Sequence, residues 1–150
     1  MEVLAEKTGC GFLEEVNIHH NYAAKEEHFG KKVMVHRKGA TSARLNEKGI
    51  VPGSQGTSSY IVIGRGNKES FESCAHGAGR RMGREEAKRR LTLEEEQKRL
   101  DDQGIVHALR SRRDLDEAAG AYKNIESVIN EQKNLSVIKT KLIPIGGIKG

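Results

Sequence analysis

The apolar residues of this chain fall into short runs separated by turn-forming residues. The clearest run, Ser59–Gly64 (SYIVIG), is rich in β-branched side chains, which favours a buried strand. Residues 32–37 alternate apolar and polar side chains, which is typical of a strand with one buried face. A bilayer crossing needs about 20 consecutive apolar residues, and no run approaches that length. We therefore predict short strands and no membrane partner.

Helical signals lie between these strands. Residues 20–28 are predicted to form a helix, because Ala23 and Ala24 are strong helix formers and Gly30 is a typical C-terminal stop. Thr92 followed three residues later by Glu95 predicts a capping box at the start of another helix. Further helices are expected over 81–91 and 124–132, a turn over 38–41, and strands before residue 76 and over 105–109 and 135–143. Interleaved elements of this kind are typical of α/β or α+β folds, and of the two we predict α+β, a mixed β-sheet with flanking helices.

The composition is lean for a chain of 150 residues: 35% of residues are hydrophobic, 31% are charged, and Trp is absent. Either much of the surface is solvated, or part of the core comes from polypeptide outside this sequence. A net charge of +5 favours an anionic partner such as nucleic acid, and a solvated basic surface is the alternative. The first residues do not resemble a secretory signal. We expect Cys10 and Cys74 to be reduced thiols in a cytoplasmic protein.

A glycine-rich turn at His76 is the most unusual segment. It follows a short predicted strand and precedes a predicted helix, with Gly77 and Gly79 close behind. Glycines let the backbone approach a ligand, and the free amides of a helix start attract anions. Arg80 can add a bidentate contact to phosphate oxygens. The pattern is typical of a phosphate site with His76 as donor or nucleophile, and the alternative is a turn that contains a histidine by chance.

Histidines at 19, 20 and 28 raise the question of metal binding, because neutral imidazole ligates Mn, Fe and Zn. On a helix His20 and His28 would lie about 12 Å apart, too far to share an ion without other ligands. The chain also has no CxxC or HxxxH pair. Surface or capping histidines are therefore the alternative.

Two further segments have a functional and a plain interpretation. The loop 52–59 (PGSQGTSS) offers amides and hydroxyls to a phosphate, ribose or base, but it lacks the lysine of a P-loop. Its alternative is a hydroxyl-rich turn. Lys38 beside Arg37, together with a basic run in 80–90, could bind an RNA backbone, and a solvated helix face is the alternative for the run. Its cations are Arg80, Arg81, Arg84, Lys88, Arg89 and Arg90.

Taken in order, several segments resemble the RtcB family of RNA-splicing ligases. They are His-His-Asn-Tyr at 19–22, Arg37-Lys38-Gly39-Ala40, Pro52-Gly53-Ser54, Ser59-Tyr60, His76-Gly77-Ala78-Gly79-Arg80, Ala121-Tyr122-Lys123 and Lys149-Gly150. This family uses GTP and Mn²⁺ to join RNA 3′-phosphate or 2′,3′-cyclic phosphate ends to 5′-hydroxyl ends. The match runs from about residue 10 to the last residue. It implies that 1–150 is the C-terminal portion of a single RtcB-like catalytic domain, without the N-terminal portion.

The resemblance also implies partners and residue roles. RNA (tRNA halves or broken RNA ends) and GTP would be the partners, and an accessory activating protein is compatible with the family. His76 would be the catalytic nucleophile that receives GMP, with Arg80 near the phosphate, and His20 would ligate Mn²⁺. The nucleotide would be bound by Asn21, Pro52, Gly53, Ser54, Gln55, Ser59, Gly77, Ala78, Gly79, Tyr122 and Lys149. The last of these would recognise guanine.

The sequence departs from the family pattern in its metal ligands. The family's remaining ligands, an Asp, a Cys and two His, precede the matched region, and Cys10 lies too close to the His-His-Asn-Tyr segment to replace that Cys. Gln55 and Gly83 replace the usual Met and Ser. We therefore keep two expectations: a GTP-dependent ligase with a histidine–GMP intermediate, and a catalytically incomplete fragment that only binds nucleotide or RNA. The isolated chain is predicted to be inactive.

Overall fold

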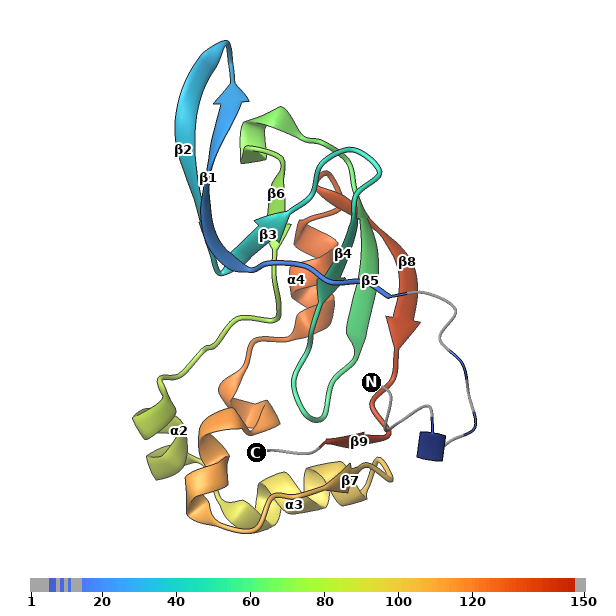
Figure 1. The fold of residues 1–150 in the computed structure, drawn as a ribbon. Coiled ribbons are helices and arrows are strands. Elements are labelled where there is room, and N and C mark those ends of the chain that lie inside the picture. The colour runs from blue at the N-terminus through green and yellow to red at the C-terminus, as the bar shows by residue number, and fades with distance from the viewer. Residues whose placement is uncertain (1–5, 8, 10, 12–14, 148–150) are drawn as a thin grey trace.

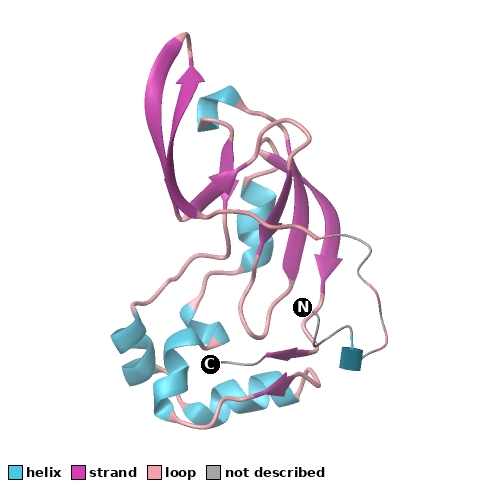
Figure 2. Cartoon of the chain, in the orientation of Figure 1, coloured by secondary structure: helices cyan, strands magenta, loops and turns pink. Residues whose placement is uncertain are grey.

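The computed structural model describes residues 6, 7, 9, 11 and 15–147, and it confirms the α+β class (Figures 1 and 2). Its strands are β1 (Asn21–His28), β2 (Lys31–Lys38), β3 (Ala40–Ser42), β4 (Lys48–Val51), β5 (Ser59–Gly64), β6 (Ser73–Ala75), β7 (Val106–His107), β8 (Ser136–Leu142) and β9 (Gly146–Gly147). Its helices are η1 (Lys68–Ser70), α2 (Arg84–Arg90), α3 (Leu93–Asp101), η2 (Arg112–Glu117), η3 (Ala119–Ala121) and α4 (Ile125–Glu131). No helix among these residues is long and apolar enough to cross a membrane.

The described strands form four small sheets with both antiparallel and parallel pairs. The largest has the order β4-β5-β8, with antiparallel neighbours. β1 pairs with β2 and β3 pairs with β6, both antiparallel, whereas the short β7–β9 pair is parallel. Figure 1 shows the β1–β2 hairpin at one end of the molecule and α2 and α3 at the other.

The main core lies between the β4-β5-β8 sheet and α4. Side chains of β5 alternate, so that Tyr60 and Val62 are buried and pack with Ile125 and Ile129 of α4. Asn124 caps this helix, because its side-chain oxygen accepts the amides of residues 126 and 127 at 2.8 and 3.3 Å. The strands predicted over 59–64 and 135–143 and the helix predicted over 124–132 are therefore confirmed.

The helix predicted over 20–28 is wrong, because these residues form the strand β1. β1 pairs along its whole length with β2, from Asn21 opposite Lys38 to His28 opposite Lys31. Phe29 and Gly30 both have positive φ, so the glycine closes a two-residue hairpin turn instead of ending a helix. Pairing with β2 outweighs the helix propensity of the two alanines, which is a weak preference in a tertiary context.

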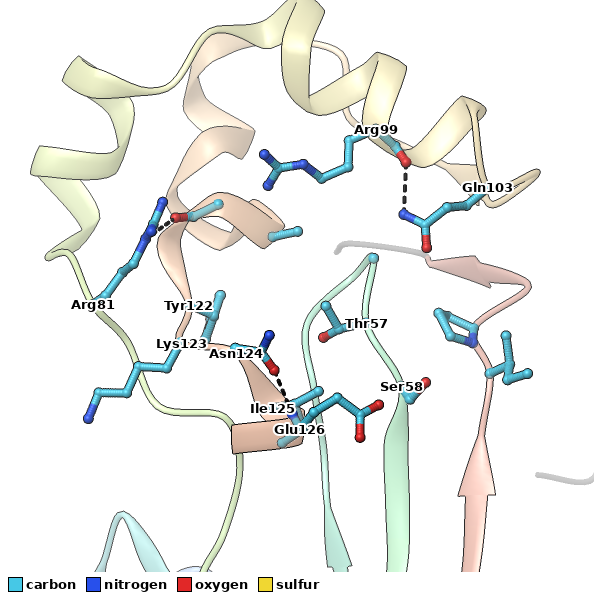
Figure 3. Close-up of a pocket in the computed structure, with 15 residues that line it drawn as sticks. Thr57, Ser58, Arg81, Arg99, Gln103, Tyr122, Lys123, Asn124, Ile125 and Glu126 are labelled. Atoms are coloured by element: carbon cyan, nitrogen blue, oxygen red, sulfur yellow. Dashed lines mark hydrogen bonds between the residues drawn. The ribbon is translucent and has the colours of Figure 1, made fainter. Parts of the chain in front are cut away.

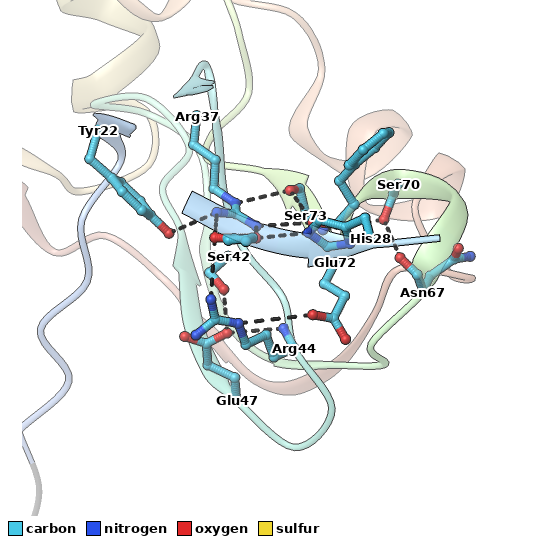
Figure 4. Close-up of polar contacts among 12 residues, drawn as sticks. Tyr22, His28, Arg37, Ser42, Arg44, Glu47, Asn67, Ser70, Glu72 and Ser73 are labelled. Atoms are coloured by element: carbon cyan, nitrogen blue, oxygen red, sulfur yellow. Dashed lines mark hydrogen bonds and ion pairs between the residues drawn. The ribbon is translucent and has the colours of Figure 1, made fainter. Parts of the chain in front are cut away.

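A buried arginine fixes this hairpin to the rest of the fold (Figure 4). Arg37 is 1% exposed, and its two terminal nitrogens donate to the carboxylate of Glu26 at 2.5 and 2.9 Å. The guanidinium also donates to the carbonyl of Phe71 at 2.9 Å, the hydroxyl of Ser73 at 3.0 Å and the hydroxyl of Tyr22 at 3.2 Å. The hairpin is thereby joined to the segment that leads through β6 into the turn at residue 76.

The region of α2, α3 and η2 differs from prediction at several element ends. α2 begins at residue 84, not at 81, and the strand predicted over 105–109 is reduced to β7. Thr92 is the residue that precedes α3, but its side chain makes no capping hydrogen bond, so the predicted capping box is not formed. Ala40 and Thr41, predicted as a turn, belong to β3. Leu109, Leu115 and residue 118 form the small core of this region.

Candidate functional site

The turn that contains His76 is fixed by its backbone between two loops. The amide of His76 donates to the carbonyl of Gly39 at 3.5 Å, and the amide of Ala78 donates to the carbonyl of Pro52 at 3.1 Å. A Cβ at Gly77 would lie 3.2 Å from that same Pro52 oxygen, so the chains approach closely there. The expectation that this turn directly precedes a helix is wrong, because α2 starts several residues later, after Gly83.

The structure brings the two predicted reactive histidines together. The ring centroids of His20 and His76 are 5.2 Å apart, with an angle of 39° between the rings. Both line a cavity of about 360 Å³ together with Pro52, Ile50 and the segment 16–18. His20 is exposed and His76 is half-buried, so both rings are accessible to a ligand. Asn21 follows directly as the first residue of β1 and is exposed.

The loop 52–59 is held by hydrogen bonds within itself. The amide of Gly53 donates to the hydroxyl of Ser59 at 3.2 Å, and the amide of Ser54 donates to the hydroxyl of Thr57 at 2.7 Å. A Cβ at Gly53 would lie 2.2 Å from the carbonyl oxygen of Ser58, so only glycine fits. The serine hydroxyls that we predicted as nucleotide contacts therefore also shape the loop. Gln55 lies at its turn and is half-buried.

A second cavity of about 460 Å³ is lined by later residues of this loop (Figure 3). Thr57 and Ser58 line it from the loop, and Tyr122 and Asn124 line it from the segment before α4. The predicted loop therefore contributes to both cavities, with Pro52 in the first and its later residues in the second. Sequence reasoning missed Thr57, although the hydroxyl-rich composition of the loop was a signal for it. The other polar residues around this cavity are Arg81, Arg99, Gln103, Lys123 and Glu126.

Arg80 and Tyr122 form a polar cluster with Glu117. The backbones of Arg80 and Tyr122 form an isolated antiparallel bridge, and the guanidinium carbon lies 4.9 Å from the centre of the tyrosine ring. Arg80 donates to the Tyr122 hydroxyl at 3.1 Å, to Glu117 at 3.3 Å and to the carbonyls of Met82 and Asp116. The tyrosine hydroxyl in turn donates to Glu117. Burial, together with this carboxylate, raises the pKa of Tyr122.

The remaining residues predicted to bind the nucleotide are Gly79, Ala78 and Lys149. Gly79 has a φ of 70°, and its carbonyl accepts the amide of Lys123 at 2.9 Å. Ala78 is buried in the main core. Lys149 and Cys10 lie outside the described residues.

The described part of the chain supplies an incomplete set of metal ligands. Within it no group of three or more His, Cys, Asp or Glu side chains could bind a metal ion. His28 is buried at the far end of the hairpin and contacts Glu26 at 2.9 Å, so it takes no part in the cavity at His20. Burial raises the pKa of Cys74 to about 11, which keeps the thiol protonated and excludes it as a ready ligand.

Comparison with known proteins assigns the family. The sequence model described as "tRNA-splicing ligase RtcB" matches residues 1–150. The RNA-splicing ligase RtcB of Escherichia coli K12 is 44% identical over 138 residues, which are 92% of this chain and 33% of that protein. The tRNA-splicing ligase RtcB of Methanocaldococcus jannaschii is 37% identical over 89% of this chain and 16% of that protein. The RNA-splicing ligase RtcB of Mycobacterium bovis is 33% identical over 99% of this chain and 39% of that protein. The chain thus spans between 16% and 39% of the length of these relatives, and it belongs to the RtcB family of tRNA-splicing ligases.

Proposed function

We propose that this chain carries the nucleotide-transfer centre of a GTP-dependent RNA ligase that joins 3′-phosphate or 2′,3′-cyclic phosphate ends to 5′-hydroxyl ends. The observation that carries this proposal is the pair of imidazoles, His20 and His76, that meet at one cavity although they lie far apart in the sequence. Membership of the RtcB family supports the same reaction class. Its place would be the cytoplasm, as we expect from the sequence.

His76 would act as the nucleophile. A neutral imidazole nitrogen attacks the α-phosphorus of GTP, so that a P–N bond forms while the P–O bond to pyrophosphate breaks. An oxygen of the RNA 3′-phosphate then attacks this phosphorus and frees the histidine. The 5′-hydroxyl oxygen finally attacks the activated 3′-phosphorus, its proton is released, and GMP departs. The backbone contacts of the turn to Gly39 and Pro52 position the ring, and positioning is a large part of such catalysis.

We infer that the base and ribose of the nucleotide occupy the cavity lined by Tyr122. Its volume of about 460 Å³ suits a small ligand, and it presents an aromatic ring beside several polar groups. Pro52 of the loop 52–59 lines the cavity at His76 and residues 56–58 line this one, so the loop would contact the nucleotide between the base and the α-phosphate. Arg80 stays a predicted catalytic residue. Its contacts to Tyr122 and Glu117 support a role in positioning the ring under the base as well.

Mn²⁺ is the metal that the resemblance implies, and His20 is the residue that would ligate it. The described residues do not complete its coordination, so further ligands would have to come from other parts of the ligase. When bound, such an ion neutralises charge on phosphate oxygens.

The test of this proposal is the mapping of covalently attached GMP. The chain is joined to the segment that precedes the matching region in the E. coli relative and is incubated with labelled GTP and Mn²⁺. We expect label on residue 76, its loss in His76→Ala, and its retention in the control His36→Ala, which removes an exposed histidine of β2. Attachment to another residue, or label retained in His76→Ala, would overturn the assignment.

A second candidate is a module that binds nucleotide or RNA without catalysis. The incomplete set of metal ligands favours it for the isolated 150 residues. We expect this chain alone to bind GTP in equilibrium dialysis but to form little or no GMP adduct. Robust adduct formation by the chain alone would exclude this candidate.

A further inference from the structure

A cluster of cations that the proposed reaction does not use lies where α2 meets η2. It surrounds a shallow cavity of about 290 Å³ lined by Lys88, Arg89, Arg112 and Arg113, with Glu85 as the one carboxylate of the lining. The first two cations come from α2 and the other two from η2. The sequence singled out the basic run of α2, but not the arginines that the fold brings beside it.

The two sides of this cavity are held together by the fold. The side chain of Arg112 donates to the backbone carbonyl of Lys88 at 2.7 Å. This carbonyl lies in the last turn of α2, where the helix itself leaves such oxygens without partners. Ala87, on the opposite side of the helix, is completely buried. The cations therefore lie on a fixed surface.

Two guanidiniums of the cluster have no counter-charge in direct contact. Neither Arg89 nor Arg113 forms a hydrogen bond or an ion pair with another residue in the described part of the chain. Lys88 pairs with Glu85 at 2.9 Å, but the Glu85 side chain is 78% exposed, and such surface pairs are weak. Glu86 pairs with Arg90 at 2.8 Å, and the hydrogen bond from Arg90 is the main cause that lowers the pKa of Glu86, with the positive charge of Arg89 among the further causes. The cavity thus combines an excess of positive charge with planar donors that match phosphate oxygens.

We propose that this cavity binds backbone phosphates of the RNA substrate, away from the ends that react. This inference rests on the proposed ligase function. The lining contains no apolar or aromatic residue, so it lacks the aromatic rings on which single-stranded bases usually stack and the buried apolar centre of a protein–protein contact. Contacts of this kind position a nucleic acid without reading its sequence. Arg89 and Arg113 would each bind one phosphate, and Arg112 would position them.

The test measures the salt dependence of RNA binding. A short fluorescein-labelled single-stranded RNA is titrated with this chain, with Arg89→Ala/Arg113→Ala, and with the control Lys31→Ala/Lys32→Ala, which removes two exposed cations from β2. We expect weaker binding by the arginine variant and a slope of log K against log salt that is smaller by about 1.4, at about 0.7 per phosphate contact. The control should keep the slope of the unchanged chain. Equal slopes for the unchanged chain and the arginine variant, or no RNA binding by the unchanged chain, overturn the proposal.

A second measurement needs no variant. Phenylglyoxal modifies accessible guanidiniums, and we expect RNA to protect Arg89 and Arg113 more than the exposed Arg65. Equal protection of all three would contradict the site. Failure of the ligase proposal would be visible separately, as the absence of GMP at His76. Failure of this inference would leave that adduct intact and would be visible only as equal slopes and equal protection.

Discussion

Arg37 and the pair Arg89 and Arg113 use the same side chain in opposite ways. Arg37 is buried, and its guanidinium donates to a carboxylate, two hydroxyls and a carbonyl of the protein. Arg89 and Arg113 are exposed and line a cavity that is rich in positive charge. In the folded protein the N–H groups of the Arg37 guanidinium already have hydrogen-bond partners, whereas those of Arg89 and Arg113 are available to a ligand. Burial and partners, rather than residue type, therefore separate structural arginines from candidate binding arginines.

The largest effect is expected from Arg37→Met. The substitution leaves the Glu26 carboxylate, whose side chain is 7% exposed, without its main partner. Breaking a buried ion pair from one side costs about 3–5 kcal/mol. Urea unfolding should show a loss of that order in the free energy of unfolding, and a loss below about 1 kcal/mol, typical of a surface pair, would contradict the structural role.

The ion pair between Arg37 and Glu26 should make the free energy of unfolding depend on pH in the acid range. The hydrogen bond from Arg37 lowers the pKa of Glu26 from 4.5 to about 2. Because the folded pKa is the lower one, its contribution to stability is complete above pH 4.5 and is lost as the pH falls toward 2. Thermal unfolding measured across this range should show the loss, and Glu26→Gln should flatten that part of the profile. An unchanged profile in the variant would assign the acid sensitivity to other groups.

Arg80 lies between the two extremes, and Glu117→Gln tests it. The change weakens the contacts of this carboxylate with Arg80 and Tyr122, for which about 1 kcal/mol of stability is expected. It should also lower the pKa of Tyr122, because part of the upward shift comes from Glu117. Ultraviolet titration reads the tyrosinate directly, and Tyr122→Phe identifies its signal. A pKa that stays in place would mean that burial alone sets it.

The smallest effect on stability is expected from Arg89→Ala/Arg113→Ala. Both side chains are exposed and form no ion pair with described residues, so the free energy of unfolding should change by less than about 0.5 kcal/mol. Circular dichroism during urea unfolding measures it. A loss as large as that of Arg37→Met would erase the contrast between the two kinds of arginine.

Local pattern was sufficient for the elements whose neighbours are local. The β-branched run of β5 and the helix α4 follow from composition and periodicity, although Asn124, predicted inside the helix, is its cap. β1 could not be predicted in this way, because its strand form depends on the partner strand and on the Phe29-Gly30 turn. Pairing across a hairpin is a tertiary property that residue propensity does not contain.

The candidate site shows the same division. The motif around His76 and the histidine at 20 could be identified from sequence, and the structure brings them to one cavity. The engagement of Arg80 with Glu117 could not be predicted, because no sequence spacing links residues so far apart. The arginines of η2 beside α2 were missed for the same reason.

The internally bonded loop 52–59 has a mechanical consequence. Pro52 lines one cavity and residues 56–58 line the other, and Gly53 lies so close to Ser58 that any Cβ at position 53 would force the loop to move. A side chain added at position 53 would therefore alter the lining of both cavities at once, because closely packed protein accommodates extra volume only by moving its neighbours.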